Sequence, residues 1–167
     1  MGNLLGLKRL NVSMANVVVR SAQSLSLAEK RILIAGVAKL RGTNELVTLS
    51  AQEYAETYDV SLDTAYSQLK SAVENIFDRY MQFQTNDSKS EGVARIRWID
   101  GYKYFDDEGY VSFGFGNQIF PYLFELNQGF FTKYQLKQAA ALRLVHSWRL
   151  LELFEQIRPE KNGKKLE

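Results

Sequence analysis

Short polar side chains recur on one side of a predicted helix that begins near Leu62. Hydroxyl and amide groups can donate to and accept from base edges in the DNA major groove, which is wide enough for an α-helix. The side chains expected to contact DNA from this helix and its amino end are Ser61, Thr64, Ser67, Gln68, Lys70 and Ser71. An ordinary solvated helix face has the same composition, so the pattern allows both interpretations.

Two arginines alternate along a predicted strand, which places Arg95 and Arg97 on one face and apolar residues on the other. Guanidinium groups suit phosphate oxygens, and Lys103 lies further along the same predicted hairpin, so we expect all three to contact DNA. Charged residues that protect an exposed strand edge are the alternative. The acidic turn at 106–108 would be repelled by DNA, so it is expected to point away from a duplex or to contact a protein.

The elements that would position these side chains are marked by capping boxes, in which a serine and a glutamate satisfy free amides at a helix start. Ser26 and Glu29 open a helix that runs to about Leu40 and is apolar nearly all round at 32–38. We interpret it as a buried core helix; the alternative is a segment prone to β aggregation.

A strand at 47–49 follows, and then Ser50 and Glu53 open a short second helix. A tight break at 59–61 separates that helix from the longer one, whose apolar positions recur from Leu62 to Tyr80. With the hairpin whose strands lie at 94–105 and 110–115, the order is that of an α+β winged helix-turn-helix.

Further elements are expected on both sides of this core. Residues 16–19 predict a short strand or extended arm, and 86–92 a polar loop. The pattern at 132–135 predicts a capping box that opens one long amphipathic helix, which ends before Pro159. The fold class is therefore a winged helix-turn-helix with additional N-terminal and C-terminal helices.

Composition narrows the functional classes. The chain has 167 residues, 46% of them hydrophobic, no cysteine, one histidine and a net charge of +2, which fits a single folded domain. No nucleophile with a matched base, phosphate-binding loop or metal-ligand spacing occurs, so we expect no catalytic residues, no cofactor and no metal. No apolar run reaches membrane-spanning length. The aromatic residues within 102–131 are interpreted as core or as a dimer contact, although such rings can also stack single-stranded bases.

Five segments follow one another along the chain, at 25–33, 54–60, 64–70, 97–99 and 142–154. Together, and in this order, they resemble the amino-terminal winged-helix domain of plasmid replication initiators of the Rep type, which bind iterons. The resemblance implies a DNA-binding domain at 1–158 that mediates dimerisation and mainly contacts the sugar–phosphate backbone of the DNA. The contacts would lie at 61–71 and on the strand that carries Arg95 and Arg97. Residues 159–167 would then be a tail that ends before a missing second winged-helix domain.

The resemblance also implies partners. These are double-stranded DNA carrying origin repeats or an operator, a second copy of the chain, and host replication proteins, with no membrane. The setting would be the bacterial cytoplasm or the interior of a host cell. Dimers of such initiators repress their own gene, and the first helix of such domains can convert to β structure. A winged-helix transcription regulator and a winged-helix module used only for protein contact are the alternative functions.

Overall fold

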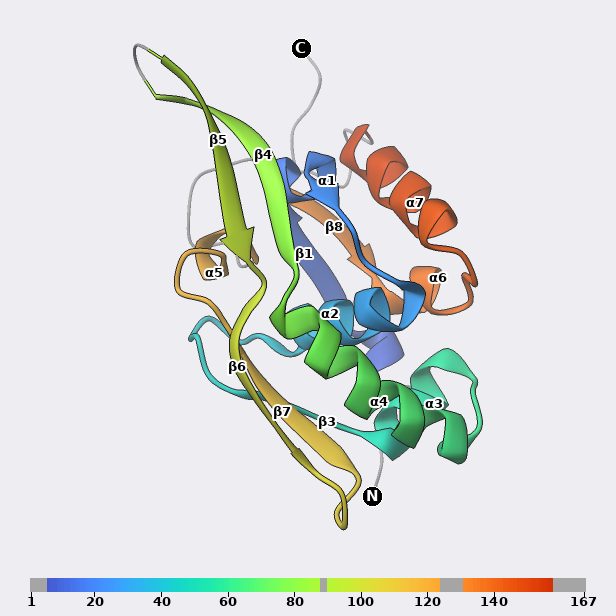
Figure 1. Cartoon of the computed structure of the whole chain (residues 1–167). Helices are drawn as coiled ribbons and strands as arrows, with labels where there is room; N and C mark the ends of the chain where they lie inside the picture. Colours follow the sequence, from blue (N-terminus) through green and yellow to red (C-terminus); the bar gives the residue numbers. More distant parts are fainter. Residues whose placement is uncertain (1–5, 88–89, 124–130, 158–167) are drawn as a thin grey trace.

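The computed structural model describes residues 6–87, 90–123 and 131–157. The helices are η1 (Gly6–Arg9), α1 (Asn16–Arg20), α2 (Leu27–Lys39), α3 (Ala51–Tyr58), α4 (Leu62–Phe77), α5 (Phe120–Leu123), α6 (Leu136–Ala140) and α7 (Val145–Ile157). The strands are β1 (Asn11–Ala15), β2 (Ala22–Gln23), β3 (Val47–Ser50), β4 (Tyr80–Asp87), β5 (Ser90–Arg97), β6 (Ile99–Phe105), β7 (Tyr110–Phe115) and β8 (Phe131–Gln135). Figure 1 shows how they are arranged, and the expected α+β class is confirmed.

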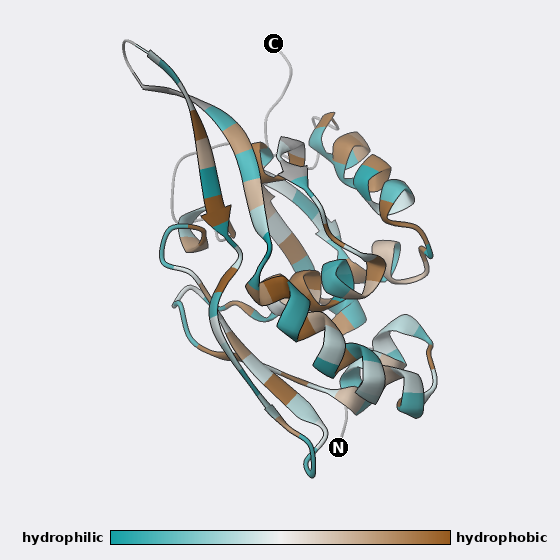
Figure 2. Ribbon diagram, in the orientation of Figure 1, coloured by the Kyte–Doolittle hydropathy of each residue, from teal (hydrophilic) through white to brown (hydrophobic). Residues whose placement is uncertain are grey.

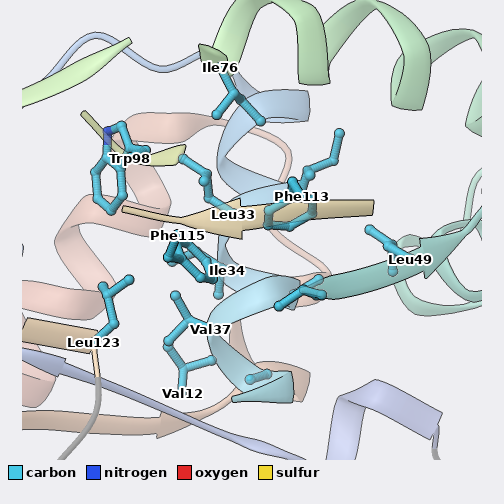
Figure 3. Packing of buried hydrophobic residues seen from close by; sticks show 14 of the residues in the cluster. Val12, Leu33, Ile34, Val37, Leu49, Ile76, Trp98, Phe113, Phe115 and Leu123 are labelled. Atoms are coloured by element: carbon cyan, nitrogen blue, oxygen red, sulfur yellow. The ribbon is translucent and has the colours of Figure 1, made fainter. Parts of the chain in front are cut away.

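Helix α2 forms the centre of the core. Ser26 caps it, because the Glu29 amide donates to the Ser26 hydroxyl oxygen at 3.2 Å. Every residue from Glu29 to Ala38 is buried. In Figure 3, Leu33 and Ile34 of this helix lie against the aromatic rings of β7. The interpretation of this apolar segment as a buried core helix is confirmed.

The winged sheet has the strand order β3-β7-β6, and all its pairs are antiparallel. Strand β7, at the centre of this sheet, is buried from Val111 to Phe115, and in Figure 2 it has brown segments between paler ones. The β6–β7 turn ends at Gly109, which has a φ of +63° that favours glycine. The sequence therefore predicted α2, β3, α3, α4 and the β6–β7 hairpin in their correct order.

A second sheet, with the order β2-β4-β5, was largely missed. The helix expected to reach Tyr80 ends at Phe77, and Tyr80 begins β4. The expected polar loop at 86–92 overlaps a hairpin, since Thr85 pairs with Gly92 and Asn86 with Glu91. Backbone pairing needs no apolar side chain, so a polar sequence did not reveal these strands. In Figure 1 the β4–β5 and β6–β7 hairpins point to opposite ends of the molecule.

The N-terminal expectation of a strand at 16–19 is wrong. Residues Asn16–Arg20 form the helix α1, and the strand β1 precedes it. Val18 and Val19 are buried, and α1 packs against α7, β1 and β4. Tertiary packing here outweighs the preference of β-branched residues for strands, which is a weak one.

The single long C-terminal helix is also wrong. The residues taken as its capping box form β8, where Thr132 pairs with Met14 of β1 and its hydroxyl donates to Asn16. The helix that follows is divided into α6 and α7 by a non-helical segment at 141–144. Additional helices at both ends are nevertheless confirmed. The predicted tail at 159–167 lies outside the described residues.

A buried polar cluster joins α7 to the core. Lys30 of α2 forms an ion pair of 2.7 Å with Glu152 of α7, and both side chains are almost fully buried. The Tyr134 hydroxyl donates to the second Glu152 oxygen at 2.6 Å, and the Trp148 indole donates to Tyr134 at 3.1 Å. Burial lowers the pKa of Lys30, although Glu152 opposes the shift. Each carboxylate oxygen of Glu152 therefore accepts a hydrogen bond from a buried side chain.

Candidate nucleic-acid interface

The helix-turn-helix geometry comes from local hydrogen bonds. Ser50 caps α3 in a complete capping box, because its hydroxyl accepts from the Glu53 amide and its own amide donates to the Glu53 carboxylate. Asp59 caps the carboxyl end of α3, and its φ of +53° turns the chain sharply. Ser61 then caps α4 by accepting from the Thr64 amide at 3.1 Å. These bonds hold α4 at a fixed angle to α3.

Helix α4 turns an apolar face inward and leaves a polar face exposed. Its buried residues recur every three or four positions and are Ala65, Leu69, Ala72, Val73 and Ile76. On the opposite side Ser67 and Ser71 are exposed, as predicted. Thr64 and Gln68 are half-buried at the border between the two faces. The protein's own body therefore leaves Ser67 and Ser71 uncovered and partly covers Thr64 and Gln68.

Two of the predicted contacts already have partners inside the protein. The Tyr54 hydroxyl of α3 donates to the Gln68 side-chain oxygen at 2.5 Å, which the sequence did not indicate. The Ser61 hydroxyl donates to the Thr64 hydroxyl at 2.8 Å. Gln68 thus joins α3 to α4, and placing it fully on the outer face was incorrect. Ser67 and Ser71 are therefore the predicted contacts of this helix that are exposed hydroxyl groups.

Lys70 points toward the β6–β7 hairpin. Its ammonium lies 3.4 Å from Asp106 and 4.9 Å from the centre of the Tyr104 ring. The hydrogen bond to Asp106 is the main reason that the pKa of Lys70 is raised. The Lys70 side chain is half exposed, so it meets solvent, but its ammonium is already paired with the Asp106 carboxylate.

Arg95 and Arg97 lie exposed at the base of the β4–β5 hairpin, on the face that their alternation predicted. Arg95 donates to Gln82 at 3.0 Å across the strand pair, and its guanidinium lies 5.1 Å from the Tyr80 ring centre. Arg97 donates to the Phe77 carbonyl at 2.7 Å, at the carboxyl end of α4. Each arginine is therefore held in place while part of its guanidinium remains accessible.

The structure does not bring Lys103 together with these residues. Tyr102 packs on Phe77 of α4, and Tyr104 lies beside Lys70, so both face α4. Successive residues of a strand point to opposite faces, which puts Lys103 on the outer face of the winged sheet, opposite Ser112. Lys103 is also on β6, in a different sheet from Arg95 and Arg97. The expectation of a continuous hairpin with all three cations on it is wrong.

One cation of this region was missed. Arg79 follows α4 and forms a 2.9 Å ion pair with Glu29, which raises the pKa of its guanidinium. It was included in the expected longer helix, and only the correct end of α4 reveals it. Helix α4 itself carries one basic residue, Lys70, and two acidic residues, Asp63 and Glu74. Near the carboxyl end of α4, Arg95 and Arg97 are exposed, whereas Arg79 is partly buried and paired with Glu29.

The described residues offer little for other chemistry. Among them there is no group of three side chains that could hold a metal ion. His146 is exposed on α7. Within the same residues, no helix has the length and apolar character needed to cross a membrane.

Comparisons with known proteins identify the family. Residues 11–155 match the family model described as Initiator Replication protein, WH1. The fold is similar to that of the Pi initiator protein solved in complex with iteron DNA, with a TM-score of 0.74 and 19% identity over 90% of this chain. The chain spans 65% of the length of that protein.

A further solved structure is similar in fold. It is the WH1 domain of MSBI1.176, a replication protein isolated from a multiple sclerosis patient, with a TM-score of 0.53 and 24% identity; the match covers 70% of this chain and 84% of that one. No curated protein sequence matches the chain. The resemblance noted from the sequence is confirmed, and the chain belongs to the initiator replication protein family, with its WH1 domain at residues 11–155.

Proposed function

We propose that this chain is a DNA-binding domain that takes part in starting replication of a plasmid or small circular episome. It would bind double-stranded origin repeats and would not be an enzyme. The observation that carries the proposal is the placement of exposed Arg95 and Arg97 at the carboxyl end of α4, the helix that also exposes Ser67 and Ser71. The family and the solved complex of the Pi initiator with iteron DNA support it.

The expected mode of binding follows from this geometry. Helix α4 would enter the major groove, with the two serines toward the base edges. Arg95 and Arg97 would bind the flanking phosphates, because two exposed guanidinium groups on one strand face suit the spacing of a backbone. Contacts of this kind fix the position of the protein on the duplex more than they specify a sequence.

The alternative functions differ in the arrangement of sites. A transcription regulator of this fold would bind an inverted repeat as a dimer, whereas an initiator that acts as a monomer binds direct repeats. We would select sites from a random duplex library and place the selected site in direct and inverted pairs. Comparable or tighter binding of the direct pair supports initiation, and binding of the inverted pair alone supports a regulator. Absence of salt-sensitive binding to any duplex would leave only protein contact.

We further propose that the domain self-associates, since β5 ends its sheet and its outer edge pairs with no other strand among the described residues. Sedimentation of the chain at micromolar concentration should show a dimer, and monomers alone would contradict this. The bacterial cytoplasm or the interior of a host cell is the setting that fits an origin-binding protein. Host replication proteins are its expected further partners.

A further inference from the structure

A groove of about 560 Å³ lies between α4 and the turn of the β6–β7 hairpin. Aromatic rings form much of its surface: Tyr66 comes from α4, and Tyr104, Phe105 and Tyr110 come from the hairpin. Tyr66 is 46% exposed and Phe105 is 39% exposed, so these rings meet solvent. Exposed aromatic rings gathered in a concave surface are typical of sites where another molecule binds.

The groove is held open by contacts of its own walls. Gly109 lies directly under the Tyr66 ring, where a β-carbon would come within 2.3 Å of a ring atom. The Gly109 carbonyl accepts from the Ala51 amide at 2.8 Å, which joins the turn to the start of α3. The hairpin turn is therefore fixed against both helices, and no rearrangement is needed to form the groove.

The charge of the groove opposes DNA. Two acidic residues, Glu74 and Asp106, line the groove, whereas Lys70 is the basic residue in its lining. Asp107 and Glu108 continue the acidic turn beside it. Figure 2 shows this hydrophilic tip at the end of the β6–β7 hairpin. Phosphates would be repelled from such a surface, whereas a cationic side chain would be attracted.

Lys70 shows how a cation can bind there. Its ammonium already sits between the Asp106 carboxylate at 3.4 Å and the Tyr104 ring at 4.9 Å. Both ion-pair partners are at least half exposed, so the pair is weak and can be exchanged for a better one. A guanidinium forms two parallel bonds to a carboxylate and stacks on an aromatic face, which an ammonium cannot do equally well.

We propose that this groove docks a segment of a partner protein in which an arginine stands beside an apolar or aromatic residue. The arginine takes the place of Lys70 between Asp106 and Tyr104, and its neighbour covers the exposed rings of Tyr66 and Phe105. The site lies away from Arg95 and Arg97, but Ser67 and Ser71 also line it, so a partner segment in the groove and a duplex on α4 would compete for this side of the helix. The inference goes beyond the proposed DNA binding, since it names a second kind of partner.

The test is an NMR titration of the chain with the peptide acetyl-Leu-Arg-Trp-Arg-Leu-amide. Signals of Tyr66, Tyr104, Asp106 and Tyr110 should shift together. The same peptide with citrulline in place of arginine should bind about tenfold more weakly, because citrulline keeps the shape but has no charge. Asp106→Asn should cause a similar loss, and Lys70→Ala should strengthen peptide binding. Glu56→Gln, an equal change of charge on the exposed surface of α3, should have no effect.

Three results would overturn the proposal. Equal affinity for the citrulline peptide would show that the groove does not select a cation. Shifts confined to another surface would place the peptide elsewhere. The third result combines three observations: a duplex oligonucleotide shifts the groove signals, Lys70→Ala weakens duplex binding, and the peptide has no effect. Together they would make the groove part of the DNA interface. Loss of duplex binding by Arg95→Ala alone would leave the groove proposal unaffected.

Discussion

At the scale of single residues, the polar groups that matter most for stability are buried and far apart in the sequence. Lys30 and Glu152 are 122 residues apart, and each stands in a helix that looks amphipathic or apolar. Their pairing, and the position of Tyr134 beside them, could not be predicted, because sequence periodicity reports which face is buried and not which residues meet. The capping serines Ser26 and Ser50 were predicted, because their bonds are local. Ser61, which was expected to contact DNA, also caps a helix.

Removing one charge of the buried pair should destabilise the fold. Glu152→Gln leaves Lys30 as a buried cation without its anion, so the free energy of unfolding in urea should fall by about 3 kcal/mol. Glu56→Gln is the matched control, and its exposed site should change stability by less than about 0.5 kcal/mol. A loss of under about 1 kcal/mol in Glu152→Gln would show that the pair contributes little.

Tyr58 should make stability depend on alkaline pH. Burial raises its pKa well above 10.0, and its hydroxyl donates to the Arg31 carbonyl at 2.6 Å. The unfolded chain releases this proton near pH 10.0 while the folded chain keeps it, so the contribution is complete below that pH and is lost as pH rises through the folded pKa. Each such group can contribute a slope of up to about 1.4 kcal/mol per pH unit.

Urea unfolding at several pH values between about 9 and 11 measures this slope. Tyr58→Phe should lower stability by about 1 kcal/mol at neutral pH and should weaken the decline above pH 10. Equal slopes in the variant and the original chain would mean that Tyr58 ionises as readily in the folded state as in the unfolded one.

At the scale of elements, local signals succeeded where tertiary contacts did not intervene. The boundaries of α2 and α3 follow capping boxes that could be recognised in the sequence. The pattern at 132–135 has the same appearance, yet it pairs with β1 as a strand. The start of β4 was hidden because Tyr80 continues the apolar spacing of α4. Short signals therefore cannot distinguish a helix start from a strand when a distant partner decides the outcome.

The same limit explains why Lys103 lies in a different sheet from the two arginines. Alternation carried on from Arg95 and Arg97 would place Lys103 on their face. The chain instead leaves one sheet near Trp98 and enters another, where an irregularity lies between Ile99 and Gly101. A break of this kind resets which residues face inward, and nothing in the alternation records it.

The packing of α2 on β7 gives a prediction at this scale. A β-carbon on Gly36 would lie 2.7 Å from the Phe113 ring and 3.1 Å from the Phe115 ring. Gly36→Ala should therefore lower the free energy of unfolding by about 1–3 kcal/mol, because the buried rings must move. Gly101→Ala is the control, since no atom lies within 4 Å of its β-carbon. Equal stability of the two variants in urea would mean that the rings adjust without cost.

At the scale of the whole molecule, the two hairpins divide the surface around α4 by charge. The acidic turn of β6–β7 lies at one end, and Arg95 and Arg97 lie at the base of β4–β5 near the other end of α4. A net charge of +2 gave no sign of this division. The fold class and both arginines could be predicted from the sequence, but the sharing of charge between two sheets required the three-dimensional arrangement.

The dependence of duplex binding on salt tests the central claim most directly. The logarithm of the binding constant should fall linearly with the logarithm of the salt concentration, and Arg95→Ala with Arg97→Ala should reduce that slope by up to about two phosphate contacts. Affinity should fall similarly for all duplex sequences, while Lys103→Ala, a cation on the outer face of the winged sheet, should leave the slope unchanged. A slope unchanged by loss of both arginines would contradict the account.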